Sequence, residues 1–407
     1  MSTGFLVLVV MLGSFFVFNL LIKLPVSLSM ALAAVFGALA GGEGFPFRHF
    51  FEGSFIYLDT MLIIITATLF MRVVEKSGAM EALGATIVQR FYRFPAVMLI
   101  LLMLIIMFPG MITGSSTASV LTVGAIVSPI LLLIGVPAPK TGAILALGAI
   151  MGMTAPPVNI HAMIIAGGVD MPFIGFGLPL LIMSVPSAII AVLILGYPHC
   201  KQLDYKNLVG SLKLKTAKKH GLKLYLPIIL IMALMGATRA FPAVIPNLGM
   251  PLIFVIGALC GLFTGERVEL LKTIRQSISD TVPVCAKLVG VGMFIQILTL
   301  TGARGTIVVG CLGLGAVLLY VACVTVMPLF GAVSSYGAAS VFGVPFLLAL
   351  LSGNQIVTAS ALAFLASIGD IMPPTALAGN YAAQIVGLKY SEVFKASILP
   401  AVICIFI

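Results

Sequence analysis

Two irregular motifs interrupt the apolar sequence, and both occur twice in the same order. The first is a cluster of small polar residues, which runs PGMITGSSTASV from Pro109 and PLFGAVSS from Pro328. The second is a Pro-Pro pair inside a helix-like apolar segment, at Pro156-Pro157 and again at Pro373-Pro374. The spacing between cluster and pair is nearly the same in both copies. We therefore predict a duplicated unit in which each copy contains a hairpin tip and a broken helix.

Composition shows which solvent surrounds these motifs. Of the 407 residues, 61% are hydrophobic and only 8% are charged, which is typical of a chain built from bilayer-spanning helices. In hydrocarbon an unpaired backbone N–H or C=O is costly, so irregular backbone persists only beside a protein-enclosed or water-filled cavity. Broken helices expose N-terminal amides, which suit anions, and C-terminal carbonyls, which suit cations. The two motifs therefore predict a site for a solute and a cation.

The apolar runs predict an all-α polytopic membrane protein with two inverted repeats. The first repeat, residues 1–198, has spans at 5–22, 25–42, 55–71 and 171–195, a re-entrant helical hairpin at 94–139 and a broken helix at 141–167. The second repeat, residues 224–407, has spans at 224–240, 251–263, 282–300 and 393–407, a hairpin at 307–351 and a broken helix at 356–386. With the broken helix, each repeat has five spans, and this odd number inverts the second repeat. Amphipathic segments at 72–93 and 265–280 are expected at the interface. Each hairpin could instead cross as two ordinary spans, because its re-entrance is inferred from the polar tip alone.

Basic residues set the orientation. Lys and Arg outnumber Asp and Glu 22 to 12, and they fall mostly between the apolar runs. A linker at 199–223 contains seven Lys, so the positive-inside rule places it in the cytoplasm. The other Lys and Arg then also lie inside, except for Arg48, Arg239 and Arg304 outside and Lys287 within a span, where snorkelling would explain it. This pattern favours membrane topology and contact with membrane lipids over nucleic-acid binding.

The order, spacing and duplication of these motifs resemble the large membrane subunit of TRAP-type (tripartite, periplasmic-binding-protein-dependent) transporters, within the wider ion-transporter superfamily. The likeness covers most of the chain and is carried by residues 71–78, 110–116, 152–157, 369–378 and 390–400. It implies an elevator-type secondary carrier that imports a small organic anion, coupled to sodium, in the cytoplasmic (inner) membrane of a bacterium or archaeon. It also implies two partners, a small membrane subunit and an extracytoplasmic binding protein.

Candidate site residues follow from the tips and the breaks. For the solute we expect hydroxyl, amide and imidazole groups: Ser115, Ser116, Thr117, Asn159, His161, Ser334, Ser335 and Asn380. For sodium, a hard cation that prefers oxygen ligands, we expect carbonyls, hydroxyls and one carboxylate: Thr113, Gly114, Gly152, Thr154, Pro156, Gly331, Gly369, Asp370, Pro373 and Thr375. Structural explanations exist for each of these. The small residues could serve close helix packing, the prolines could produce a packing kink, and His161 could be a core residue with satisfied hydrogen bonds. Asp280 is expected to cap a helix start.

Other functions stay open from the residues alone. The chain also departs from the pattern of the family it resembles: its second tip, residues 330–336, lacks the acidic residue that the family often has near that position. A stand-alone proton- or sodium-coupled carrier of the same superfamily is therefore the alternative. A passive channel would need a continuous polar face along several spans, and a structural membrane subunit would need no site. An intramembrane enzyme would need a nucleophile–base set, a metal-ligand cluster or a phosphate loop, and the sequence offers none. We expect no cofactor beyond the coupling ion. The solute, the coupling ion and the choice between monomer and homodimer are not set by the sequence.

Overall fold

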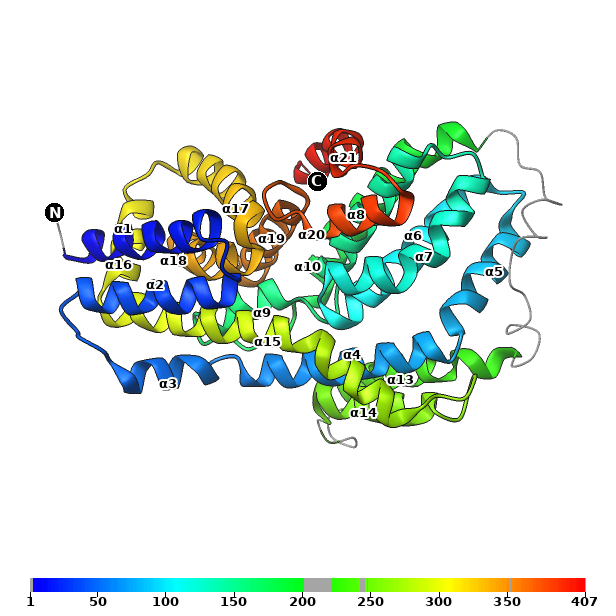
Figure 1. Cartoon of the computed structure of the whole chain (residues 1–407), viewed down its shortest axis with the longest axis horizontal. Helices are drawn as coiled ribbons and strands as arrows, with labels where there is room; N and C mark the ends of the chain where they lie inside the picture. Colours follow the sequence, from blue (N-terminus) through cyan, green and yellow to red (C-terminus); the bar gives the residue numbers. More distant parts are fainter. Residues whose placement is uncertain (1–2, 201–220, 242–245, 247, 352, 407) are drawn as a thin grey trace. The chain divides into compact units, whose positions relative to one another are not determined.

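The computed structural model describes residues 3–200, 221–241, 246, 248–351 and 353–406, and the Lys-rich linker predicted at 199–223 falls largely outside them. The described residues form helices joined by short connections, with no strand among them (Figure 1). The predicted all-helical class is therefore confirmed.

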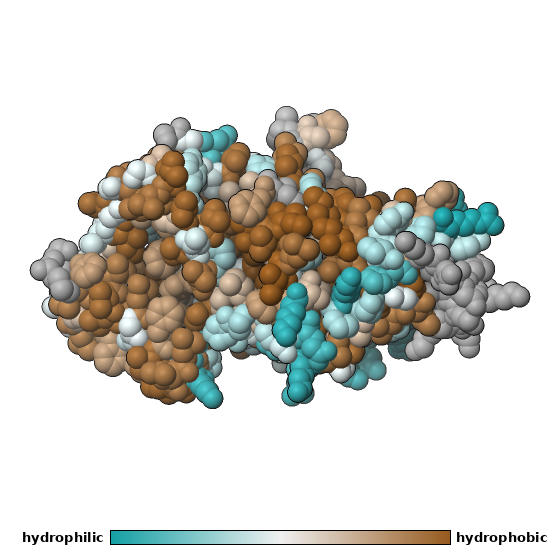
Figure 2. All heavy atoms as spheres, turned by 90° about the horizontal axis from the view of Figure 1, so that it is seen from above, coloured by the Kyte–Doolittle hydropathy of each residue, from teal (hydrophilic) through white to brown (hydrophobic). Residues whose placement is uncertain are grey.

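Eight helical segments of the described chain are long and apolar enough to cross a bilayer. They are Thr3–Leu21, Phe47–Lys76, Pro95–Thr113, Ser116–Leu133, Gly177–His199, Gly221–Thr238, Leu270–Leu300 and Ala316–Ala349. Hydrophobic residues dominate the face seen in Figure 2, where hydrophilic residues gather in a few groups. Large apolar side chains are strongly exposed on the outside, for example Phe47 at 72% and Leu271 at 85%. A multi-pass membrane protein requires such a lipid-facing surface.

The chain divides into two compact units, each assembled from three separate stretches. Unit 1 consists of Met1–Met61, Asn159–Leu180 and Val282–Ala376, and unit 2 consists of Leu62–Val158, Leu181–Thr281 and Leu377–Ile407. Three helices run through a boundary between these stretches: α4 (Leu58–Lys76), α10 (Gly177–Gly196) and α15 (Leu270–Leu300). The predicted sequential repeats, 1–198 and 224–407, describe the duplication of the sequence and stay a prediction.

Unit 1 contains α1 (Thr3–Phe16), η1 (Val17–Leu21), α2 (Val26–Ala40), α3 (Phe47–Phe55), α9 (Ile160–Gly167), α16 (Ala303–Leu312), α17 (Ala316–Ala338), η4 (Ala339–Gly343), α18 (Val344–Ala349), α19 (Gln355–Ile368) and η5 (Gly369–Ile371). α17 packs against α19 and η5, and α9 packs against α19 (Figure 1). The second hairpin therefore lies beside the first half of the second broken helix, and α9 is the second half of the first broken helix.

Unit 2 contains α5 (Ala79–Phe91), α6 (Pro95–Thr113), α7 (Ser116–Leu133), α8 (Ala138–Thr154), η2 (Tyr197–His199), η3 (Gly221–Tyr225), α13 (Leu226–Ala240), α14 (Gly249–Gly261), α20 (Leu377–Val386) and α21 (Tyr390–Ile405). Its centre is α8, which is buried from Thr141 to Thr154 and packs against α6, α7, α20 and α21. Each unit thus combines one hairpin, the first half of its own broken helix and the second half of the other one.

Three predicted boundaries were wrong. The segment 72–93 is divided between the end of α4 and α5, because Gly78, with φ +81°, stops α4 in a left-handed conformation. The segment 265–280 is no separate interface helix: α15 runs unbroken from Leu270 to Leu300, since Pro283 is tolerated inside a membrane helix. The second hairpin begins at Ala316 and not at residue 307, because α16 forms its own short helix before it.

Candidate functional site

The first hairpin tip, in unit 2, is a short polar turn between α6 and α7. Gly114 has φ +65°, which glycine adopts without steric cost, and it ends α6. Ser115 follows in an extended conformation, and its hydroxyl oxygen accepts a hydrogen bond from the amide of Ala118 at 3.3 Å, which caps α7. The hydroxyl of Thr113 donates to the carbonyl of Pro109 at 2.7 Å. The local sequence therefore forms the predicted tip.

The end of α8 packs backbone against backbone on this hairpin. A Cβ atom on Gly110 would lie 2.8 Å from the amide nitrogen of Met153, closer than real contacts allow. A Cβ atom on Gly152 would collide with backbone atoms of α6. Just after the Pro-Pro pair, the amide of Val158 donates to the carbonyl of Met111 at 3.1 Å. The first break is thus fixed directly to α6, near its C-terminal end.

The second tip and break, in unit 1, repeat this contact. A Cβ atom on Gly331 would lie 2.6 Å from the carbonyl oxygen of Ala366, and one on Gly369 would lie 2.6 Å from the Cα atom of Gly331. After the second Pro-Pro pair, the amide and the hydroxyl of Thr375 both donate to the carbonyl of Ala332, at 3.2 and 2.7 Å. Because the same kinds of contact recur at corresponding positions, the packing of tip on break is duplicated along with the sequence.

The two tips turn differently. At the second tip the chain leaves helical geometry at one residue, Ser334, with φ −158° and ψ 108°. Its hydroxyl oxygen accepts from the amide of Gly337 at 3.0 Å, as Ser115 does at the first tip. The sequence pattern aligns Gly331 with Gly114, but the contacts place Gly331 where Gly110 lies in the first copy. The second turn is two residues shorter, so it has no counterpart of Gly114.

The predicted site residues fall into two groups, one in each unit. Unit 2 holds Thr113, Gly114, Ser115, Ser116, Thr117, Gly152, Thr154, Pro156 and Asn380, and unit 1 holds Asn159, His161, Gly331, Ser334, Ser335, Gly369, Asp370, Pro373 and Thr375. Both Pro-Pro peptide bonds are cis. Asn159 caps α9 by accepting from the amide of Ala162 at 2.9 Å, which is a structural role. That the two groups share one solute stays a prediction.

A cluster of ionisable side chains lies where the second tip meets the second break. The rings of His161 and Tyr336 stack at 5.0 Å, and His161 Nδ1 lies 3.2 Å from the hydroxyl of Ser367. Lys287 Nζ lies over the Tyr336 ring, 5.4 Å from its centroid, and Lys287 interacts electrostatically with Asp370. His161 and Asp370 are therefore brought together in one cluster, as members of the two predicted sets.

Sequence reasoning missed two members of this cluster. It explained Lys287 by snorkelling, whereas the structure places the ammonium group over a ring that is only 7% exposed. A lysine inside a predicted span was the available signal, because ionisable groups in a membrane are usually functional. Tyr336 gave no signal of its own, since a tyrosine near a hairpin tip is compatible with simple packing.

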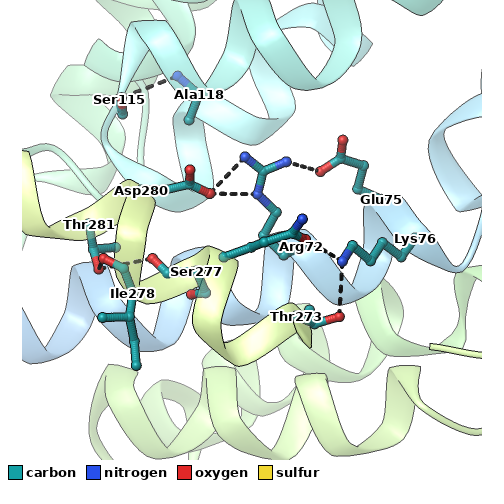
Figure 3. Close-up of polar contacts among 11 residues, drawn as sticks. Arg72, Glu75, Lys76, Ser115, Ala118, Thr273, Ser277, Ile278, Asp280 and Thr281 are labelled. Carbon is teal, nitrogen blue, oxygen red and sulfur yellow. Dashed lines mark hydrogen bonds and ion pairs between the residues drawn. The ribbon is translucent and has the colours of Figure 1, made fainter. Parts of the chain in front are cut away.

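A second group of charges lies in unit 2, on α4 and α15. Figure 3 shows Arg72 between Glu75 and Asp280, with nitrogen–oxygen distances of 2.8 and 2.7 Å. Lys76 donates to the hydroxyl of Thr273 at 3.2 Å. Asp280 was predicted to cap a helix start, which is wrong: it lies inside α15 and pairs with Arg72 instead, because the helix continues through this position. These contacts join the two helices within unit 2.

Comparison with known proteins identifies a transporter family for this chain. No individual curated protein matches the chain. Residues 12–407, nearly the whole length, match the family described as "Tripartite ATP-independent periplasmic transporter, DctM component". The duplicated packing of a polar tip on a broken helix agrees with what carriers use to build sites. The chain therefore belongs to the DctM family, the large permease components of TRAP transporters.

Proposed function

We propose that this chain is the large permease of a sodium-coupled secondary carrier that imports a small organic anion, a carboxylate, across a bacterial or archaeal inner membrane. Its partners would be a small membrane subunit and an extracytoplasmic binding protein, as in its family. The movement would be of the elevator type, with the two tips and breaks in the mobile part. The observation that carries this proposal is the duplicated contact of Gly110 with α8 and of Gly331 with α19 and η5.

The donor chemistry at the first break fits sodium. The hydroxyl groups of Thr113 and Thr154 both donate to carbonyls one helical turn earlier, at 2.7 and 2.8 Å. A hydroxyl that has donated its proton presents oxygen lone pairs to other partners, and a hard cation binds such oxygens. We assign sodium to these hydroxyls together with carbonyl groups of Gly114, Gly152 and Pro156. At the second break Gly331, Gly369, Asp370, Pro373 and Thr375 offer comparable oxygens to a cation.

The solute would be held by the small polar side chains at the tips and beyond the breaks. We assign this role to Ser115, Ser116, Thr117 and Asn380 in unit 2 and to Asn159, His161, Ser334 and Ser335 in unit 1. Neutral hydroxyl and amide groups can donate hydrogen bonds to a carboxylate without a large desolvation penalty of their own. The solute would leave such a site when sodium dissociates and the contacts that held the sodium open.

The test is uptake into proteoliposomes that contain the chain and its partner subunits. A screen of carboxylates for raised thermal stability in sodium, against choline, selects the solute first. We expect an inward sodium gradient to accelerate its uptake and to allow accumulation. Uptake that is indifferent to sodium and to proton gradients alike would contradict the proposal. Uptake that persists without the partner subunits would instead identify a stand-alone carrier of the same superfamily.

A further inference from the structure

Lys287 lies over an aromatic ring and interacts with a carboxylate, and both of these groups attract a cation. Its ammonium nitrogen lies 5.4 Å from the centroid of the Tyr336 ring, within the range of a cation–π contact. The carboxylate of Asp370 interacts electrostatically with it, and the His161 ring stacks on the same Tyr336 ring at 5.0 Å. Tyr336 and Asp370 are each only 7% exposed and His161 is fully buried. Since α15, α17, η5 and α9 each supply one member, the cluster is a feature of the packed unit and not of one local segment.

The two ring nitrogens of His161 have different surroundings. The hydroxyl oxygen of Ser367 lies 2.8 Å from the carbonyl oxygen of Ala363 and 3.2 Å from His161 Nδ1. When this hydroxyl donates to Ala363, its oxygen accepts from Nδ1–H of the neutral ring, and Nε2 then carries a lone pair. Within the described chain Nε2 has no hydrogen-bond partner, although the ring is fully buried. A buried lone pair of this kind is costly, and a nearby cation offsets that cost.

The segments of the first tip and break differ from those of the second in their own residues. In the register of the two glycine contacts, Met153 takes the place of Asp370. In the register of the two capping serines, Thr117 takes the place of Tyr336. The first tip and break, residues 109–118 and 151–158, contain no charged residue at all. The two copies therefore share a backbone arrangement and differ in charge.

We propose that the ammonium group of Lys287 is a tethered cation that takes the place of a coupling sodium ion at the second break, so that only the first break binds sodium. This inference rests on the proposed sodium coupling. A carboxylate such as Asp370 needs a positive partner inside a membrane. A covalently attached ammonium group is present at a high effective concentration beside the carboxylate. Sodium from solution would have to compete with that effective concentration to bind there. The carrier then moves fewer sodium ions per cycle than one with sodium at both breaks.

Sodium binding to the purified chain tests this directly. Radioactive sodium alone is titrated against the detergent-solubilised protein, and the number of sites per chain is compared between variants. Lys287→Gln removes the tethered charge and is expected to bind about one additional sodium ion per chain, because Asp370 and the oxygens around it then lack a cation. Lys287→Arg keeps the charge and should bind as many as the unsubstituted chain. The matched control is Lys272→Gln, an exposed lysine of the same helix, which should change nothing.

A second variant keeps the inference testable if Lys287→Gln does not fold. Asp370→Asn is expected to leave the number of bound sodium ions unchanged, since in the native chain the charge of Asp370 is balanced by the ammonium group of Lys287 and not by sodium. A lost sodium site in Asp370→Asn, or no gained site in well-folded Lys287→Gln, would overturn the tethered cation. The proposed function is tested separately, by uptake. If uptake by the native chain does not depend on sodium, the proposed sodium coupling is wrong. If uptake is driven by sodium but Lys287→Gln binds no additional sodium ion, only the proposed role of Lys287 is wrong.

Discussion

The two breaks rest on the same backbone contact and carry different chemistry. At the first, Gly110 packs on α8 and the neighbouring Met153 is neutral; at the second, Gly331 packs on α19 and η5 and the corresponding residue is Asp370. The close glycine contacts are present in both copies, whereas the charges are present in one. The contact is therefore a requirement of the architecture, and the side chains around it decide what each break holds. Four tests by substitution would break or sharpen this comparison.

The largest effect is expected from filling the glycine contacts. Gly152→Val and Gly369→Val both force a side chain into backbone atoms that cannot move away, and such overpacking costs about 3 kcal/mol or more, so uptake should fall about a hundredfold or further. Gly84→Ala is the control, because its Cβ would meet Ile126 at an ordinary 3.8 Å. If one of the two valine variants transported normally, the two contacts would not be equivalent. Uptake normalised to inserted protein is the measurement.

Removing the aromatic ring over Lys287 should have the next largest effect, at the second break alone. A desolvated cation–π contact is worth about 2 kcal/mol, so Tyr336→Leu should lower uptake at limiting sodium by about thirtyfold. Tyr336→Phe keeps the ring and should transport nearly as well as the native chain. Equal losses in Tyr336→Leu and Tyr336→Phe would mean that the phenol hydroxyl, not the ring, matters.

The hydroxyl of Thr375 distinguishes the two breaks more modestly. It adds a second hydrogen bond to the carbonyl of Ala332, at 2.7 Å, whereas the first break has only the amide of Val158. Thr375→Val removes one hydrogen bond and should lower the free energy of unfolding by about 1 kcal/mol, seen as a lower midpoint of thermal unfolding. Thr325→Val is the control, since its exposed hydroxyl bonds only to its own helix. An unchanged midpoint in Thr375→Val would remove this distinction.

The smallest effect is expected at the ion pair of unit 2. Arg72 and Asp280 are 26% and 38% exposed, so a double-mutant cycle with Arg72→Met and Asp280→Asn should give a coupling of about 0.5–1 kcal/mol in thermal unfolding. Neither variant should alter the number of sodium ions bound, because this pair lies on α4 and α15 and not at a break. A lost sodium site in either variant would extend the sodium-binding region of unit 2 to these charges.

The sequence predicted those parts of the fold that depend on local chemistry. Both tips and both breaks lie where Pro, Gly and Ser interrupt the apolar runs, because these residues set the backbone locally. The boundaries at 72–93 and 265–280 were wrong, since amphipathic character does not show whether a helix continues into its neighbour. The equivalence of Gly331 with Gly110 could be found only from the contacts, because it depends on which residue of each hairpin touches the helix before the Pro-Pro pair.

Residues far apart in the chain account for what the sequence could not show. Lys287, Tyr336 and His161 come from three different helices, α15, α17 and α9, and nothing within any one of these helices indicates the other two residues. Their meeting depends on how the helices of unit 1 pack, which periodicity does not report. The residues assigned to sodium and to the solute stay predictions, since the structure shows their positions and not their ligands.

The exchange of stretches between the units has a consequence for how the protein is made. Unit 1 needs Met1–Met61 and also Val282–Ala376, and unit 2 is finished only by Leu377–Ile407. Most of the chain must therefore be synthesised before either unit can close. Until then the early helices lie in the bilayer without the later helices that complete their unit. A premature stop between Leu62 and Ala376 leaves neither unit whole, so truncated products of this gene should be degraded rather than retain half a carrier.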